Sequence, residues 1–427
     1  MRNGRNARDE ARCFAAVEVR MRLVQTILWF AVFTASAIAQ PATGALQAER
    51  GGRGGQEAGM RSVEIAPDGR VTFRLHAPNA GEVLLNGNWP GGRGMKMIKD
   101  ASGNWSVTTE PLKPESWVYT FTVDGITALD PLNSQVARDI TRYQNLLLVS
   151  GPESEFIKVS RVPHGTVAEV WYPSTGLKTD RRMAVYLPPG YETSNARFPV
   201  LYLIHGGSSD EDQWGEMGAA NVILDNLIAQ RRAKPMIIIM PNANWNDIAA
   251  LDFGGVRAST AVPGAGGLPP AGGISYDRAE QEIVGDIIPF VEKAYRTLPG
   301  RENRAITGLS MGGGIAINVG LKRLDIFANV GEFSAGIFGG VAAGAYPEFA
   351  FEKVSPGFLK DPAATNRKLK VLYFACGTED PRMPFQQKIA GNLRSKGINL
   401  VFKGFPGDHE WRVWRYSLAD MAPLLFK

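Results

Sequence analysis

Apolar and polar positions follow a period of two between residues 62 and 150. Runs such as Val71–Leu75 and Trp117–Val123 alternate in this way, and Pro-Asn, Gly-Gly, Ser-Gly and Asp-Gly pairs separate them. Alternation with this period is typical of half-buried strands, and several short strands with turn residues between them indicate a sandwich. We therefore predict an all-β, immunoglobulin-like sandwich domain over residues 62–150.

A different pattern begins near residue 166, where apolar strands and helix-period stretches alternate. The runs 200–204 and 236–240 are continuously apolar, as strands buried on both faces of a parallel sheet are. Alternation of strands and helices predicts an α/β fold with a mostly parallel sheet over residues 166–427. The other expected strands are 182–187, 328–333, 370–375 and 400–402, and the expected helices are 219–230, 276–296 and 411–426.

The segment Gly308-Leu309-Ser310-Met311-Gly312 has the spacing G-x-S-x-G and lies between an expected strand and an expected helix. This context is typical of a nucleophile elbow, in which a sharp turn exposes the serine hydroxyl above the sheet. Side chains at the two glycines would clash in such a turn. The alternative is a glycine-rich turn with an idle serine, but the strand and helix on either side favour a nucleophile.

A serine nucleophile needs a base, and this fold places the triad in the order serine, acid, histidine. The chain has four histidines, and His409 is the one that follows Ser310. The acid is expected after a strand between these two residues, where the chain offers both Glu379 and Asp380. The residues alone leave this choice open.

Two backbone N–H groups are expected to hold the oxyanion. One belongs to Met311, directly after the nucleophile, and the other comes from the loop after strand 200–204. That loop begins His205-Gly206-Gly207, and we select Gly207 as the second donor. We expect His205 to support the loop rather than to act in catalysis.

Residues 1–39 have the features of a secretory signal peptide. Arg20 and Arg22 precede an apolar run over residues 23–33, and Ala37-Ile38-Ala39 is an A-x-A cleavage site. The run is too short to span a bilayer, so we expect a secreted or periplasmic protein without a membrane anchor. Met21 is an alternative start.

The other segments and the composition add few constraints. Residues 40–61 are rich in Gly and Ala and are expected to be a flexible linker, and 151–165 a second linker. Removal of the leader would remove Cys13, leaving Cys376 alone and no disulfide. The net charge is +5 without a long basic run, so nucleic acid is not an expected partner. We see no metal-ligand cluster and expect no cofactor; the oligomeric state is not indicated.

With these residues in hand, positions 166–427 resemble the esterase-D-type family, which includes feruloyl and acetyl-xylan esterases (carbohydrate esterase family one) and enterochelin esterases. The resemblance implies an α/β-hydrolase fold, a Ser-His-Asp acyl-enzyme mechanism, Asp380 as the acid, and oxyanion donors at Met311 and Gly207. The matching segments are 186–191, 203–207, 226–228, 306–313, 376–380 and 407–411.

Residues 62–150 resemble the carbohydrate-binding module of glycogen-branching and debranching enzymes. The matching pieces are 68–69, 73–75, 77–78, 103–105, 119–121, 123–125 and 130–133. Trp105 is expected in the core, and Trp89, in a Gly- and Asn-rich loop, is the candidate for stacking on a sugar. The alternative is a sandwich that only supports the neighbouring active site.

These patterns and resemblances together predict a secreted serine carboxylesterase that hydrolyses feruloyl or acetyl esters on xylan, with a polysaccharide or oligosaccharide ester as substrate. Trp214, Trp245 and the Gly- and Pro-rich loop 251–275 are expected to form an apolar wall for the acyl group. The alternatives are a siderophore (enterochelin-type) esterase and a non-catalytic carbohydrate-binding protein.

The leader gives the first testable prediction. Because the A-x-A site ends at Ala39, the exported protein should begin at Gln40, with or without cyclisation of this terminal glutamine. Mass spectrometry of the intact protein measures which mass is present. Retention of residues 1–39 on a cytoplasmic protein would contradict export.

Overall fold

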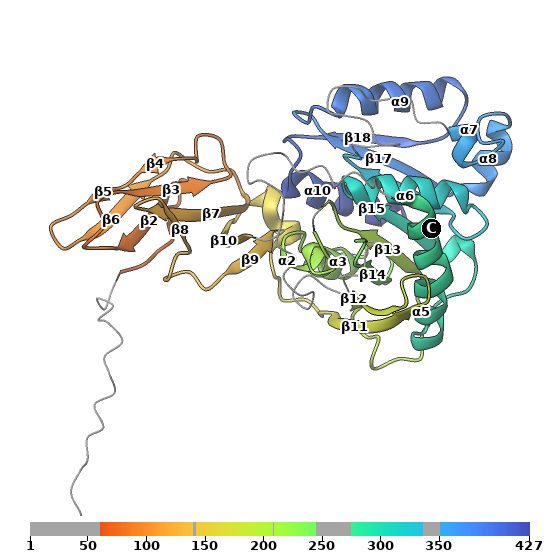
Figure 1. The fold of residues 1–427 in the computed structure, drawn as a ribbon, viewed down its shortest axis with the longest axis horizontal. Coiled ribbons are helices and arrows are strands. Elements are labelled where there is room, and N and C mark those ends of the chain that lie inside the picture. Colours follow the sequence, from red (N-terminus) through yellow and green to blue (C-terminus); the bar gives the residue numbers. More distant parts are fainter. Residues whose placement is uncertain (1–59, 140–141, 208, 245–274, 336–350) are drawn as a thin grey trace, which may run out of the picture. The chain divides into compact units, whose positions relative to one another are not determined.

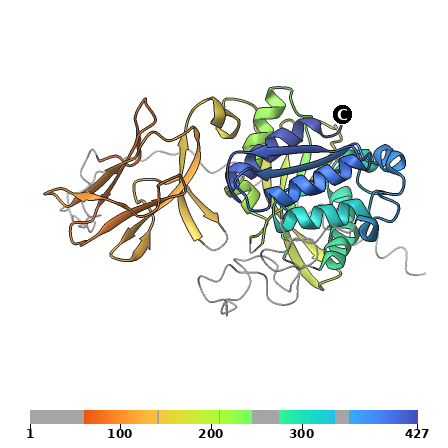
Figure 2. The same cartoon turned by 90° about the horizontal axis from the view of Figure 1, so that it is seen from above.

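The computed structural model describes residues 60–139, 142–207, 209–244, 275–335 and 351–427 (Figures 1 and 2). All of them belong to one compact unit, Gly59–Lys427. The expected leader and most of both the first linker (40–61) and loop 251–275 lie outside the described residues.

Two antiparallel sheets occupy residues 64–149. The strand order is β1-β2-β6-β5 in the first sheet and β4-β3-β7-β10-β9 in the second, where β8 also pairs with β7. The strands are β1 (Glu64–Ile65), β2 (Val71–His76), β3 (Val83–Gly87), β4 (Met95–Lys96), β5 (Ile98–Lys99), β6 (Asn104–Thr108), β7 (Glu115–Val123), β8 (Ile126–Ala128), β9 (Val136–Asp139) and β10 (Arg142–Val149).

One aromatic core joins these two sheets. Phe73 of β2 and Phe121 of β7 are fully buried in it, as the alternation of their strands predicts. Trp105 is also a core residue, and its indole N–H donates to the carbonyl of Ala77 at 2.9 Å. Inward side chains from both sheets therefore hold residues 64–149 together.

The expected second linker contains a short 3-10 helix, η1 (Pro152–Ile157). Its Ile157 is buried, and the side-chain amide of Asn226 donates to the carbonyls of Phe156 and Lys158 at 3.0 and 2.9 Å. This segment is packed against the following part of the chain by apolar contacts and hydrogen bonds.

The rest of the chain forms an eight-stranded sheet in the order β11-β12-β14-β13-β15-β16-β17-β18. Pairing is antiparallel from β11 to β14 and parallel from β14 to β18. The strands are β11 (Thr166–Ser174), β12 (Thr179–Leu187), β13 (Val200–Ile204), β14 (Ile237–Pro241), β15 (Arg304–Gly308), β16 (Asn329–Phe333), β17 (Val371–Gly377) and β18 (Val401–Phe405).

Helices cover both faces of this sheet (Figures 1 and 2). One buried cluster joins the sheet to the helical segment 276–294, α6 and α9, and the other joins it to α3 and α10. The helices are α2 (Gln213–Glu216), α3 (Ala220–Ala229), α4 (Tyr276–Glu280), α5 (Ile288–Ala294), α6 (Met311–Lys322), α7 (Phe351–Val354), α8 (Pro362–Lys368), α9 (Met383–Ser395) and α10 (Trp411–Met421). The fold is therefore of the α/β-hydrolase type.

The helix expected over residues 276–296 is present over residues 276–294, but it is not α-helical throughout. A π-helical stretch, η2 (Gln281–Ile287), separates α4 from α5, and Pro289 lies at the start of α5. Proline has no N–H to donate to the preceding turn, so it disrupts the regular helical hydrogen bonding there. None of the helices in the described ranges is long and apolar enough to cross a membrane.

Candidate active site

The turn between β15 and α6 exposes Ser310. This serine has a left-handed φ of 52° and a ψ of −113°, which few residues other than glycine adopt. A Cβ added at Gly308 would lie 2.6 Å from the carbonyl oxygen of Ile204, and one at Gly312 would lie 2.3 Å from that of His205. The two glycines of the motif are thus required by the close approach of β13.

Ser310, His409 and Asp380 lie in one hydrogen-bonded chain. The Ser310 Oγ is 2.9 Å from His409 Nε2, and His409 Nδ1 is 2.8 Å from Asp380 Oδ2. His409 comes from the loop after β18 and Asp380 from the loop after β17, at the carboxyl ends of neighbouring strands. The structure therefore brings together the three residues that the sequence predicted as a triad.

The Asp380 carboxylate is buried and compensated. Burial raises its pKa, but the hydrogen bond and charge of His409, together with the N–H and guanidinium of Arg382, outweigh burial and lower the pKa to about 2. The carboxylate therefore contributes stability above its ordinary pKa, and this contribution is lost as the pH falls toward 2. The neighbouring Glu379 is exposed, so the histidine is oriented by Asp380.

His205 fixes the peptide that carries the second expected oxyanion donor. Its Nδ1–H donates to the Gly206 carbonyl at 2.7 Å, and its Nε2 accepts from the N–H of Ala243 at 2.8 Å. In a trans peptide the C=O and the next N–H point in opposite directions, so this contact turns the N–H of Gly207 away from the buried imidazole. Burial, with help from the charge of Arg181, lowers the pKa of His205 to about 4, which keeps the ring neutral.

A cavity of about 780 Å³ opens beside the serine, and Gly207, Ser310 and His409 line it. The loop Gly87–Arg93 of the β-sheet region lines it as well. Met311 is the first residue of α6, so its N–H has no partner within the helix. Of the two residues predicted for the oxyanion hole, Gly207 lines the same cavity as Ser310, and Met311 follows the nucleophile at the start of α6.

The three tryptophans predicted to contact substrate have different positions. Trp89 lines the cavity but is only 4% exposed, because its ring stacks on Phe73 at a centroid distance of 5.6 Å. Trp214 is not a cavity residue: it is 1% exposed and donates its indole N–H to the carbonyl of Ile204 at 3.0 Å. The expected wall residue is thus part of the core beneath the site. Trp245 lies outside the described residues.

Sequence reasoning missed the aromatic residues after the base. Trp411 and Trp414, at the start of α10, line the cavity, and the Trp414 ring meets the His409 imidazole edge to face at 5.0 Å. Their spacing of three residues on a helix directly after His409 was the available signal. Within the described ranges, no group of three or more His, Cys, Asp or Glu side chains is placed to hold a metal ion.

The sheet order, the strained serine turn and the hydrogen-bonded triad define an α/β-hydrolase site. The esterase family model matches residues 174–425, which is more than half of the chain, and the chain belongs to this family.

A curated relative with esterase activity in its name supports this family assignment. The endo-1,4-beta-xylanase/feruloyl esterase of Xylanibacter ruminicola is 30% identical over 381 residues, which cover 86% of this chain and 46% of that protein. The chain thus spans less than half the length of that relative.

Solved structures show similar folds. A CE1 ferulic acid esterase from Anaeromyces mucronatus, in complex with ferulic acid, has a TM-score of 0.52 and 26% identity, covering 66% of this chain and 98% of that chain. The enterobactin esterase of Shigella flexneri has a TM-score of 0.58 and 16% identity, covering 84% of this chain and 95% of that chain.

The triad gives a prediction for activity. Ser310→Ala, His409→Ala and Asp380→Asn should each lower kcat by roughly 10³-fold or more, because each removes one member of a unit that acts together. The rate of ester hydrolysis by each variant measures the loss of activity. Thermal unfolding of the same variant shows whether it is folded. Glu379→Gln is the matched control, and a larger loss in this variant than in Asp380→Asn would contradict the choice of acid.

The strained turn gives a prediction for stability. Ser310→Gly and Ser310→Ala both remove the hydroxyl, but only glycine also removes the Cβ that is strained at a φ of 52°. Ser310→Gly should therefore be more stable than Ser310→Ala, by about 1 kcal/mol, in thermal or denaturant unfolding. Equal stability would mean that the turn stores no strain at this Cβ.

Proposed function

We propose that this protein is a secreted serine carboxylesterase that hydrolyses feruloyl or acetyl esters on plant cell-wall xylan. The observation that carries the proposal is the chain from Ser310 through His409 to Asp380, with distances of 2.9 and 2.8 Å, at the wall of a large cavity. Such a chain lets a serine act as a nucleophile at neutral pH.

The proposed reaction has two acyl-transfer steps. His409 Nε2 takes the proton from Ser310 Oγ as this oxygen attacks the ester carbonyl, and the N–H groups of Met311 and Gly207 stabilise the oxyanion. His409 then gives the proton to the leaving sugar oxygen. Water activated by the same imidazole hydrolyses the acyl-enzyme, while Asp380 stabilises the imidazolium formed in each step.

Several observations support an acyl group on a sugar polymer. The Xylanibacter relative carries xylanase and feruloyl esterase activities in its name, and the Anaeromyces structure holds ferulic acid. A cavity of about 780 Å³ has room for an aromatic acid with part of its sugar, and Trp411 and Trp414 give it apolar walls. We therefore favour feruloyl over acetyl esters.

Export and sugar binding are parts of the same proposal. The A-x-A leader supports export, and the resemblance of residues 62–150 to carbohydrate-binding modules supports contact with a polymer. The loop Gly87–Arg93, which lines the cavity, is the part of this region best placed to touch a sugar next to the scissile ester.

A siderophore ester is the second candidate. The similarity to the Shigella enterobactin esterase covers 84% of this chain, a larger share than residues 166–427 alone could give. A β-sheet region followed by an α/β-hydrolase fold is therefore compatible with both a feruloyl or acetyl esterase and a siderophore esterase. A non-catalytic carbohydrate-binding protein is disfavoured, because such a protein has no use for the hydrogen-bonded triad.

The substrate proposal predicts an order of specificity constants. Methyl ferulate or feruloyl-arabinoxylan should be hydrolysed with a several-fold higher kcat/KM than acetylated xylan, since stacking on a tryptophan adds about 1 kcal/mol. An ester panel that also contains an enterobactin-type triester measures this order, with Ser310→Ala as the blank. Activity on the siderophore ester alone would contradict the proposal.

A further inference from the structure

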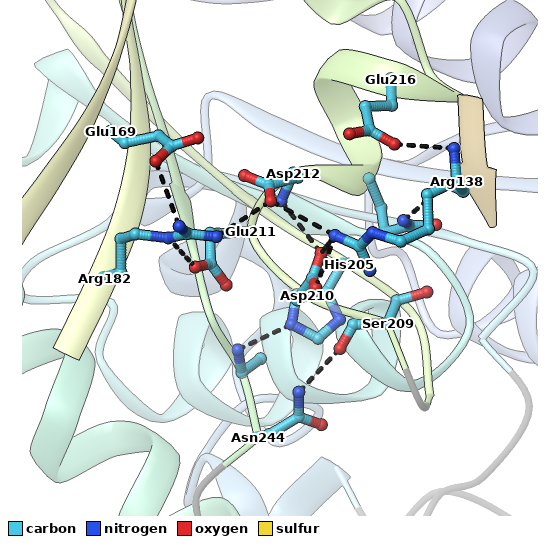
Figure 3. A network of polar contacts seen from close by, with 12 residues as sticks. Arg138, Glu169, Arg182, His205, Ser209, Asp210, Glu211, Asp212, Glu216 and Asn244 are labelled. Carbon is cyan, nitrogen blue, oxygen red and sulfur yellow. Dashed lines mark hydrogen bonds and ion pairs between the residues drawn. The ribbon is translucent and has the colours of Figure 1, made fainter. Parts of the chain in front are cut away.

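An acidic turn, Asp210-Glu211-Asp212, follows the glycine loop His205–Gly207 and leads into α2 (Figure 3). The side chains of Asp210 and Glu211 are fully buried, and that of Asp212 is 18% exposed. Three adjacent carboxyl groups are rarely buried unless cations compensate them. The cationic side chains that pair with these carboxyl groups therefore hold the acidic turn in place.

Arg182 of β12 holds one side of the acidic turn. Its Nε donates to Glu211 Oε1 at 2.5 Å, and its Nη2 donates to Asp212 Oδ2 at 3.0 Å. A third contact, of 3.1 Å, joins its Nη1 to Glu169 of β11 (Figure 3). This arginine belongs to the same sheet as β15, the strand that leads to the nucleophile.

Arg138 holds the other side, and it comes from β9 in the β-sheet region. Its Nη2 lies 2.8 Å from Asp210 Oδ2 and 3.3 Å from Asp212 Oδ2. Its main chain also takes part, because its N–H donates to Glu216 Oε2 and its carbonyl accepts from Gln213 Nε2, both at 2.8 Å. Arg138, which lies 72 positions before Asp210 in the sequence, thus contacts the acidic turn and the start of α2 at several points.

The charge balance makes each arginine important. Among the residues that the structure describes around this turn, the guanidinium groups of Arg138 and Arg182 face five carboxyl groups. These belong to Glu169, Asp210, Glu211, Asp212 and Glu216. Burial raises the pKa of Glu211 to about 7 and that of Asp212 to about 6, and the charge of Asp210 adds to both shifts. Loss of a guanidinium would leave buried carboxylates without compensation, which is strongly destabilising locally.

The acidic turn is tied to the peptide that carries the Gly207 N–H. The N–H of Ser209 donates to the Gly206 carbonyl at 3.4 Å, and the carbonyl of Ser209 accepts from Asn244 Nδ2 at 2.7 Å (Figure 3). Gly206 also packs closely on the elbow, since a Cβ there would lie 2.5 Å from Leu309 Cδ1. A shift of the turn would therefore move the expected oxyanion donor relative to Ser310.

We infer that Arg138 is a positioning residue for the oxyanion hole, supplied to the catalytic site by the β-sheet region. The inference rests on the proposed serine-esterase function. It assigns residues 64–149 a part in the chemical step, separate from any part in binding a polymer.

The test uses the full-length protein, a small chromogenic ester such as p-nitrophenyl acetate, and the variants Arg138→Met and Arg138→Lys. Arg138→Met should lower kcat by about 10- to 100-fold with little change in KM, because a misplaced oxyanion donor weakens only transition-state binding. Arg138→Lys should recover part of kcat, since an ammonium can pair with Asp210 but lacks the fork that spans two carboxylates.

Two controls separate positioning from folding. Titration with a serine-directed p-nitrophenyl phosphonate counts competent sites by the p-nitrophenol released at completion, so kcat is expressed per active site. Glu115→Gln removes the charge that pairs with Arg415 at 2.8 Å. This pair joins β7 of the β-sheet region to α10, and neither residue belongs to the acidic turn. This variant should keep kcat near that of the wild type.

Three results would overturn the inference: an unchanged kcat in Arg138→Met, an activity loss that only mirrors the loss of titrated sites, or an equal drop in Glu115→Gln. Any of these would leave the proposed function intact as long as Ser310→Ala is inactive. Hydrolysis that persists in Ser310→Ala would contradict the proposed function, and the positioning role with it.

Discussion

The close approach of β13 to the turn at Ser310 is the constraint on which the site depends. The carbonyl oxygens of Ile204 and His205 leave no space for a Cβ at Gly308 or Gly312, so the chain must reverse tightly there. This reversal holds the serine at a left-handed φ and sets the start of α6 beside the loop after β13. The serine and both expected oxyanion groups owe their proximity to this one contact between neighbouring strands.

Local patterns predicted the α/β fold and the positions of the nucleophile and the base, whereas Asp380 was selected by the family resemblance. The G-x-S-x-G spacing and the order of residues along the fold selected Ser310 and His409, because both follow from the chain path over a parallel sheet. The residues could not separate Glu379 from Asp380, since the side chain that faces inward after a strand depends on the turn. Trp214 was expected at the surface of the site but is buried in the core, because aromatic residues suit both places.

Contacts between distant segments had no local signal. Arg138 and Asp210 are 72 positions apart, and neither lies in a motif that names its partner. The same holds for the pKa values of the buried carboxyl groups, which shift in opposite directions at different sites. At Asp380 the hydrogen-bond donors and positive charges lower the pKa by more than burial raises it. Glu211 and Asp212 share two arginines with three further acids, so burial raises their pKa values. Such balances depend on the assembled structure.

The contacts of β9 also bear on how such a chain can be rearranged. A part that only tethered the enzyme to a polymer could be exchanged for another binder by shuffling of gene segments. Here the strand delivers a cation, a carbonyl and an N–H group to the acidic turn and to the start of α2. A replacement would have to restore that positive charge at the same place, or the acidic turn after the glycine loop would lose one of the two arginines that pair with it. A working exchange of residues 64–149 would therefore require matched changes in the acidic turn, so that the buried charges on both sides still balance.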